Sequence, residues 1–162
     1  MWDLAPMIGV LLATGLGLLV GCEREFFGKA AGIRTNTLVA MGAALFTAIS
    51  KFGFLAGLDG TLAHVDVSRV AAGIVTGIGF LGAGLIFVRH DAVKGLTTAA
   101  GIWFVAAVGM AAGVGLFGVA MVATATYLVV MIGVRPLERY LPRSRSQSGP
   151  DEEESETKRS TS

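Results

Sequence analysis

The sequence predicts an all-α integral membrane protein with five transmembrane helices. Hydrophobic residues make up 53% of its 162 residues, 23 residues are glycine, and the mean hydropathy is +0.68. A spanning helix needs about 20 mostly apolar residues, and the apolar runs of this chain reach that length. They are too long and continuous for the strands of a closed barrel, the other fold that satisfies backbone groups in lipid.

Charge and cysteine content exclude other classes. The net charge of +1 gives no electrostatic reason to expect a nucleic acid partner. Cys22 is the single cysteine, so no disulfide can form within the chain. The lipid bilayer is therefore the first partner that we expect.

The first two predicted spans cover residues 4–21 and 37–55, and the second carries Lys51 near its far end, where a long side chain can reach the interface. Between them, five ionisable side chains fall within twelve residues: Glu23, Arg24, Glu25, Lys29 and Arg34. The stretch is either a solvated connector or a polar cluster held against the helix ends and the second loop at residues 94–98. Its spacing alone leaves both interpretations open.

The third predicted span covers residues 67–88. Asp66 stands where a helix N-cap belongs, and Arg69 follows on the same side of the first turn. Capping is one interpretation, and a polar mouth formed by this pair is the other. Residues 89–95 are expected to form a short polar turn.

The fourth and fifth predicted spans cover residues 96–114 and 116–134, with Gly113 and Gly115 as candidates for the tight turn between them. Beyond them, residues 142–162 are rich in Ser, Arg and Glu and contain no apolar core, which is typical of disorder. We therefore expect a transmembrane domain over residues 1–141 and a disordered cytoplasmic tail over residues 142–162.

The basic residues predict the orientation, because cytoplasmic loops carry an excess of Lys and Arg. The loops after the first and third spans and the tail hold all but two of the 13 basic residues; Lys51 and Arg69 are the exceptions. Five spans then place the N-terminus outside and the C-terminus in the cytoplasm.

A glycine pattern runs through the third span: Gly77, Gly79 and Gly82 match the GxGxxG spacing of dinucleotide-binding loops. That fingerprint needs a preceding strand and an aqueous setting, so we reject it inside an apolar run. Glycines on one face instead allow helices to approach closely. We expect this packing role for Gly77, Gly79, Gly82 and Gly84, and for the pairs Gly17/Gly21 and Gly109/Gly113.

Two short matches suggest an internal repeat. Residues 15–19 (GLGLL) match residues 77–81 (GIGFL), and residues 32–35 (GIRT) match residues 95–98 (GLTT), at offsets of 62 and 63. Spans one and two would then be related to spans three and four as parallel repeats. The two charged loops would face each other.

Several of these motifs together resemble the MgtC/SapB family of bacterial inner-membrane proteins. The resemblance rests on Glu23-Arg24-Glu25, on residues 28–35 (GKAAGIRT), on residues 77–84 (GIGFLGAG), and on residues 95–100 (GLTTAA) with Trp103. It covers roughly residues 7–134 and implies a five-helix membrane domain. Members are linked to growth in low magnesium, to survival inside host cells and, for one member, to inhibition of the ATP synthase.

The chain resembles the short, SapB-like form, because only 28 residues follow Val134 where longer members append a folded cytoplasmic domain. The matched positions define a candidate functional polar cluster: Glu23, Arg24, Glu25, Lys29, Arg34, Thr35, Asp66, Arg69, Thr97 and Thr98. The family supplies no activity for them and no cofactor, and the sequence does not say whether a metal binds.

The sequence shows no nucleophile paired with a base, no metal-ligand cluster and no phosphate-binding loop outside the apolar runs. We therefore expect that the protein is not an enzyme. Two classes remain. The favoured one is a regulator that binds another membrane complex, such as the ATP synthase, or that serves adaptation to magnesium limitation, with a homo-oligomer left open. The alternative is a small transporter or channel for magnesium or another cation, although the acids between residues 37 and 134 lie only at membrane edges.

Overall fold

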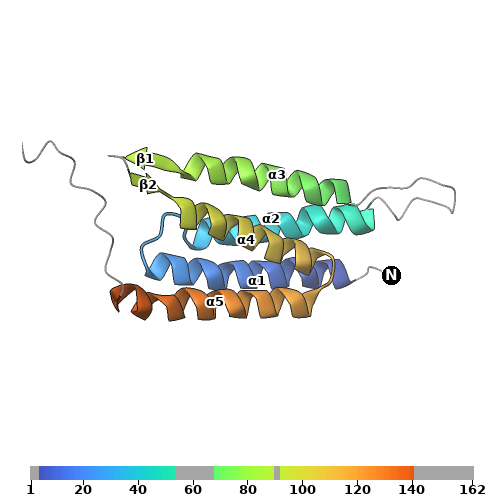
Figure 1. Cartoon of the computed structure of the whole chain (residues 1–162). Helices are drawn as coiled ribbons and strands as arrows, with labels where there is room; N and C mark the ends of the chain where they lie inside the picture. The colour runs from blue at the N-terminus through green and yellow to red at the C-terminus, as the bar shows by residue number, and fades with distance from the viewer. Residues whose placement is uncertain (1–3, 54–67, 90–91, 141–162) are drawn as a thin grey trace, which may run out of the picture. The chain divides into compact units, whose positions relative to one another are not determined.

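A computed structural model describes residues 4–53, 68–89 and 92–140 of the chain (Figure 1). Its internal contacts divide the chain into two units, Met1–Val129 and Val130–Ser162, which are described separately. Asp66 and the tail of residues 142–162 lie outside the described residues, so the expected domain limits and the disorder of the tail stay predictions.

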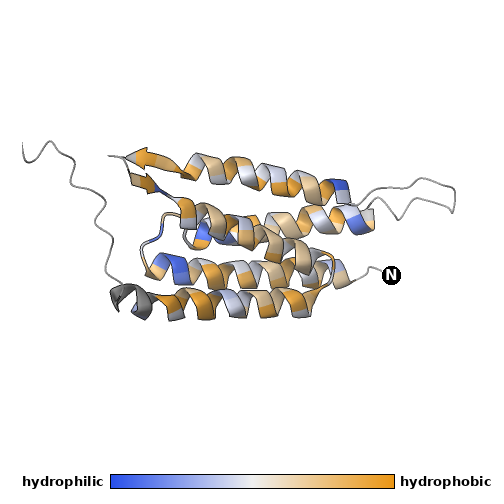
Figure 2. Ribbon diagram, in the orientation of Figure 1, coloured by the Kyte–Doolittle hydropathy of each residue, from blue (hydrophilic) through white to orange (hydrophobic). Residues whose placement is uncertain are grey.

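Five helices form the described chain, as the sequence predicts. They are α1 (Leu4–Phe26), α2 (Ile33–Ala48), α3 (Ser68–Leu85), α4 (Leu96–Gly113) and α5 (Phe117–Tyr140), and a π turn, η1 (Ile49–Gly53), continues α2. Four of these helices, α1, α3, α4 and α5, are long and apolar enough to cross a membrane, and apolar residues colour most of their length (Figure 2). Helix α2 has 16 residues, and its role as a fifth span stays a prediction.

Several boundaries differ from the predicted ones by three residues or more. Helix α2 begins at Ile33, four residues before the predicted start of the second span, and α5 continues to Tyr140, six residues beyond the predicted end of the fifth. Helix α1 continues to Phe26, so Glu23, Arg24 and Glu25 lie in its last turns rather than in the connecting loop. Helix α3 ends at Leu85, three residues before the predicted end of the third span. The sequence predicted a simple polar turn after it, and that prediction is wrong.

A β-hairpin follows α3 instead. Strands β1 (Phe87–Arg89) and β2 (Ala92–Lys94) pair antiparallel, with Val88 opposite Val93. The aromatic and β-branched side chains of this stretch favour strands. A short apolar run gives no periodicity by which it could be told from the end of a helix.

Within the first unit, α1 and α3 run in one direction and α2 and α4 in the other (Figure 1). The α1–α2 loop and the hairpin therefore lie at the same end of these helices, which we call the charged end. Gly32 is the N-cap of α2 and Gly95 is the N-cap of α4. The motif matched at residues 32–35 and 95–98 thus has the same structural place in both helix pairs, as a parallel repeat requires.

Close packing joins α1, α2 and α4 through small residues. A Cβ atom at Gly17 would lie 2.6 Å from the Cβ of Ala40, and one at Gly113 would lie 2.5 Å from the backbone oxygen of Ala44. At Gly109 it would overlap the backbone oxygen of Ala40. Glycine is needed here because most of the neighbouring atoms belong to backbone and the Cβ of Ala40 is fixed to it, and the expected packing of Gly17/Gly21 and Gly109/Gly113 is confirmed.

The packing role predicted for Gly77, Gly79 and Gly84 is wrong within this chain. A Cβ atom at any of these positions would meet no heavy atom of the described structure within 4 Å. Gly82 is the one buried residue of α3 and would place a Cβ 3.5 Å from that of Ala99. The reason is that α3 packs mainly on α4, and within the described structure Gly82 is the glycine of α3 that meets this helix.

Candidate functional site: a buried arginine at the charged end

Arg24 lies in the last turns of α1 and is only 2% exposed. Its Nε donates a hydrogen bond to the backbone oxygen of Ala31 at 2.9 Å, and its Nη2 donates to Oγ1 of Thr98 at 2.9 Å. Its Nη1 donates to the hydroxyl of Tyr127 at 3.4 Å. One guanidinium therefore joins α1, the α1–α2 loop, α4 and α5.

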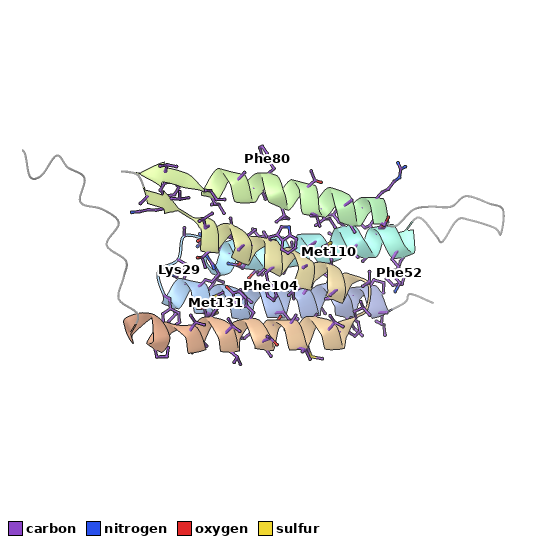
Figure 3. All side chains as sticks on the ribbon, viewed as in Figure 1. Lys29, Phe52, Phe80, Phe104, Met110 and Met131 are labelled. Carbon is purple, nitrogen blue, oxygen red and sulfur yellow. The ribbon has the colours of Figure 1, made fainter. Side chains whose placement is uncertain are left out.

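Local structure explains how these partners reach Arg24. Gly95 has a φ of 93°, which favours glycine, and it starts α4 so that Thr98 falls in the first turn. One turn further, a Cβ at Gly101 would lie 2.8 Å from Nη1 of Arg24, so a larger residue would occupy the space of the guanidinium. The ring of Tyr127 stacks on Phe104 with centroids 4.8 Å apart, which holds its hydroxyl in place. Phe104 is labelled in Figure 3.

Asn36 completes the buried group from the first turn of α2. Its Nδ2 donates to the backbone oxygens of Ala31 at 2.9 Å and Gly32 at 2.8 Å, and the side chain is fully buried. Ala31 thus accepts from both Asn36 and Arg24, which fixes the loop between α1 and α2. The Oδ1 of Asn36 has no hydrogen-bond partner among the described residues.

The charge of Arg24 meets only neutral oxygens among the described residues: a backbone carbonyl and two hydroxyls. A buried charge is costly unless it is paired or hydrogen-bonded, and charged side chains inside membrane proteins are usually kept for function. Arg24 is therefore the positively charged centre of the site. We call Arg24, Ala31, Asn36, Thr98 and Tyr127 the arginine cluster.

Glu25 does not join the arginine cluster. Its side chain is exposed, and its Oε2 accepts a hydrogen bond from the backbone N–H of Ile33 at 2.9 Å. This contact passes over Gly32, where a Cβ would overlap the carboxylate oxygen. Glu25 thus caps the N-terminus of α2, where negative charge is favourable.

The other predicted site residues are not brought together. Glu23 is half-buried, whereas the remaining described members are exposed on the surface: Lys29, Arg34, Thr35, Arg69 and Thr97. Arg69 lies in the first turn of α3 and Arg24 in the last turn of α1, and the start of α3 and the end of α1 lie at opposite ends of these helices (Figure 1). Ten residues were predicted as one polar cluster, and within the described part of the chain the structure joins Arg24 and Thr98 by a hydrogen bond between their side chains.

Lys51 makes a specific contact at the opposite end. Its Nζ donates to the backbone oxygen of Val114 at 2.6 Å, just after α4, and lies 5.1 Å from the ring centroid of Phe52. Phe52 is labelled in Figure 3. The sequence suggested that this lysine reaches the interface, and the structure adds that it ties the end of α2 to the α4–α5 turn.

Three members of the arginine cluster were missed from sequence: Ala31, Asn36 and Tyr127. Asn36 and Tyr127 each carried a signal, because a polar side chain within an apolar run is a candidate for function. Ala31 carried none, since it contributes its backbone oxygen. Within the described part of the chain, no group of three His, Cys, Asp or Glu side chains could hold a metal ion.

The helices and the buried arginine together define a multi-pass α-helical membrane protein. Comparison with known protein families matches residues 10–140 to the MgtC family. The match covers most of the chain, so the protein belongs to this family.

Several curated relatives are similar to the chain. It is 49% identical to Protein MgtC of Brucella abortus over 126 residues, which cover 78% of the chain and 50% of that protein. It is 45% identical to the "Putative magnesium transporter YhiD" of Escherichia coli K12 over 122 residues, covering 75% and 56% respectively. It is 40% identical to Protein SrpB of Synechococcus elongatus over 139 residues, covering 80% and 75%.

The chain spans about half the length of MgtC and YhiD. No solved structure matches it.

Proposed function

We propose that this protein is a non-enzymatic regulator in the bacterial inner membrane, which acts by binding another membrane protein complex and serves adaptation to magnesium limitation. The observation that carries the proposal is the buried Arg24, whose hydrogen bonds within the described part of the chain go to neutral oxygens. A fixed positive charge suits a site that holds helices in one arrangement, and it opposes the entry of a cation.

Electrostatics favours regulation over cation passage. A divalent cation near Arg24 would be repelled, and repulsion between charges is strong where water is scarce. Cation pathways instead use rings of carboxylates or carbonyl oxygens. Two described acids flank Arg24 along the chain: Glu23 is half-buried, and Glu25 is exposed and accepts a hydrogen bond from the backbone N–H of Ile33.

The charged end is proposed to face the cytoplasm. The basic residues of the two loops there, Lys29, Arg34 and Lys94, are exposed, and the excess of such residues marks the cytoplasmic side. The N-terminus of α1 would then be outside. The partner complex, with the ATP synthase as one candidate, would reach the arginine cluster from within the membrane or from the cytoplasm.

Transport of magnesium is the second candidate, because one relative is named as a magnesium transporter. It would require a pathway that avoids Arg24. Reconstitution separates the two: the purified chain in liposomes loaded with a magnesium-sensitive dye should give the same influx as empty liposomes. Saturable magnesium influx above that background would contradict the regulator proposal and support a magnesium transporter.

A second experiment tests the regulator directly. The tagged chain is purified from cells in mild detergent, and co-purifying membrane proteins are identified for the wild type, Arg24→Gln and Lys29→Gln. Both substitutions remove one cation from the charged end, but only Arg24 is buried. We expect a stoichiometric partner with the wild type and Lys29→Gln that is lost with Arg24→Gln, at equal abundance in the membrane. Purification of the wild type without any stoichiometric partner would contradict the proposal.

A further inference from the structure

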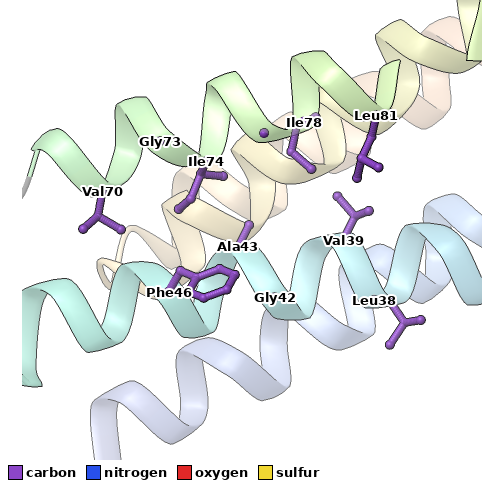
Figure 4. A pocket seen from close by; sticks show the side chains of 11 residues that line it. Leu38, Val39, Gly42, Ala43, Phe46, Val70, Gly73, Ile74, Ile78 and Leu81 are labelled. Atoms are coloured by element: carbon purple, nitrogen blue, oxygen red, sulfur yellow. The ribbon is translucent and has the colours of Figure 1, made fainter. Parts of the chain in front are cut away.

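An apolar groove lies between α2 and α3 (Figure 4). Its volume is about 590 Å³, which falls within the range of roughly 300–1,000 Å³ typical of small-molecule sites. Leu38 and Leu81 line one end, Phe46 and Val70 the other, and all of its lining residues are apolar or glycine. It lies outside the arginine cluster and shares no residue with it.

Three glycines account for the space. Gly42 on α2 and Gly73 and Gly77 on α3 line the groove, and a Cβ at each would meet nothing within 4 Å. Gly73 and Gly77 are four residues apart and lie on one face of α3. Leucines at these positions would fill the groove, so glycine keeps it open.

The length of the groove matches one leaflet of the bilayer. Val70 and Leu81 are eleven positions apart on α3, which is about 16 Å along the helix axis. The hydrocarbon core is about 30 Å thick, so one leaflet is about half of that. A transmembrane helix would overhang such a groove by a wide margin, whereas a single acyl chain from one leaflet would fit its length.

Positive charge lies at one end of the groove. Arg34 is exposed and precedes Leu38 by four residues, on the same face of α2 as Leu38, Gly42 and Phe46. On the α3 side, Lys94 is exposed and precedes Gly95, where a Cβ would overlap the backbone oxygen of Leu85. Lys94 thus lies beside the end of α3, one turn beyond Leu81. Both cations are placed to meet a phosphate at the surface of the leaflet.

We propose that the groove binds one acyl chain of an anionic phospholipid, whose phosphate is held by Arg34 and Lys94. The binding site is a property of α2 and α3 alone and goes beyond the regulatory function proposed above. Apolar contact along the groove supplies affinity, and the two cations select an anionic headgroup. Each basic residue near a membrane surface contributes about 1 kcal/mol, or roughly fivefold in affinity, toward an anionic lipid.

Native mass spectrometry of the delipidated chain in detergent, titrated with phosphatidylglycerol or phosphatidylethanolamine, tests the site. We expect one saturable phosphatidylglycerol adduct with the wild type and about fivefold weaker binding with Arg34→Gln. Lys29→Gln serves as the control, because Lys29 is exposed at the same end but does not lie on the groove. Binding of phosphatidylethanolamine should be weaker and unaffected by Arg34→Gln.

Matched glycine variants test the groove itself. Gly77→Leu fills it, whereas Gly79→Leu adds the same side chain to the same helix at a position that does not line it and that also has open space. Gly42→Leu fills the groove from the opposite wall. We expect loss of the adduct with Gly77→Leu and Gly42→Leu and its retention with Gly79→Leu, with circular dichroism confirming helix content in all three.

Two outcomes would overturn the proposal. Equal phosphatidylglycerol binding by the wild type, Gly77→Leu and Gly42→Leu would show that lipid does not occupy the groove. A dimer mass that is present for the wild type, unaffected by added lipid and lost with Gly77→Leu would assign the groove to a second copy of the chain.

Discussion

Helices α1, α2 and α4 on one side, and helix α3 on the other, use glycine in opposite ways. In the first group, glycines such as Gly17 and Gly109 bring backbones so close that no Cβ would fit. In α3, Gly73 and Gly77 have the same four-residue spacing as Gly17 and Gly21, but open space around them. Phe80, which follows Gly79 in the same helix, points away from the other helices (Figure 3). Glycine spacing shows which residues share a helix face, but not whether that face is covered.

The two regions also differ in polar content. The group of α1, α2 and α4 encloses Arg24, Asn36 and Thr98, whereas α3 buries only Gly82. A buried hydrogen-bonded network tends to specify one arrangement of its helices. We therefore expect substitutions in the first region to act on stability and those in α3 to act on what binds there.

The largest effect is expected from Arg24→Ala, which removes three hydrogen bonds and leaves a cavity among α1, α4 and α5. Large-to-small replacements in a core cost about 2–5 kcal/mol, and stranded buried partners add to this. The loss in free energy of unfolding should be about 3–5 kcal/mol, measured by denaturation in mixed micelles. Lys29→Ala removes an exposed cation at the same end, and its free energy of unfolding should stay within about 0.5 kcal/mol of the wild type. Equal denaturation midpoints for the two variants would show that the arginine cluster does not stabilise the fold.

Gly109→Leu is next, because its Cβ would overlap the backbone oxygen of Ala40 and α2 would have to move. Overpacking of this kind costs about 1–3 kcal/mol and occasionally more. The midpoint of thermal unfolding in detergent should fall, and fewer backbone amides of α2 and α4 should be protected from hydrogen exchange. An unchanged midpoint would show that α2 and α4 separate at little cost.

Glu25→Gln should have a smaller effect. The carboxylate accepts from the N–H of Ile33 at the start of α2, and negative charge there is worth about 0.3–1 kcal/mol. Gly32→Ala should lose at least as much, because its Cβ would displace the same carboxylate. If Gly32→Ala were neutral while Glu25→Gln was not, the carboxylate would have another binding partner.

The smallest effect is expected for Gly79→Leu, within about 0.5 kcal/mol of the wild type. The site is exposed and a side chain meets nothing there. The sequence alone predicted a packing role for Gly79, so that a leucine there would destabilise the fold. The stability of Gly79→Leu therefore tests this prediction against the open space seen in the structure. A large loss of stability would mean that this face of α3 is covered in the detergent-solubilised protein.

Much of the fold follows from the sequence for physical reasons. Apolar length predicts the helices, and the match between residues 32–35 and 95–98 suggested a repeat, whose two copies the structure places at the starts of α2 and α4. The hairpin at residues 87–94 could not be predicted, because three-residue apolar strands have no periodicity. Arg24 was among the candidates, but nothing in its spacing separates a buried arginine from the exposed Arg34. Burial depends on which helices meet, and that depends on long-range packing.

The π turn Ile49–Gly53 at the end of α2 has a consequence for changes in chain length. A π turn accommodates one more residue than the α-helical turn it replaces. Deleting Ser50 would convert this segment to a regular helical turn and bring Lys51 one position closer to α2, which changes the direction of its side chain around the helix axis. Lys51 would then turn away from the oxygen of Val114, and the end of α2 would lose its link to the α4–α5 turn. The π turn therefore sets the direction of Lys51, and deletion of one residue before Lys51 should weaken the link between the end of α2 and the α4–α5 turn.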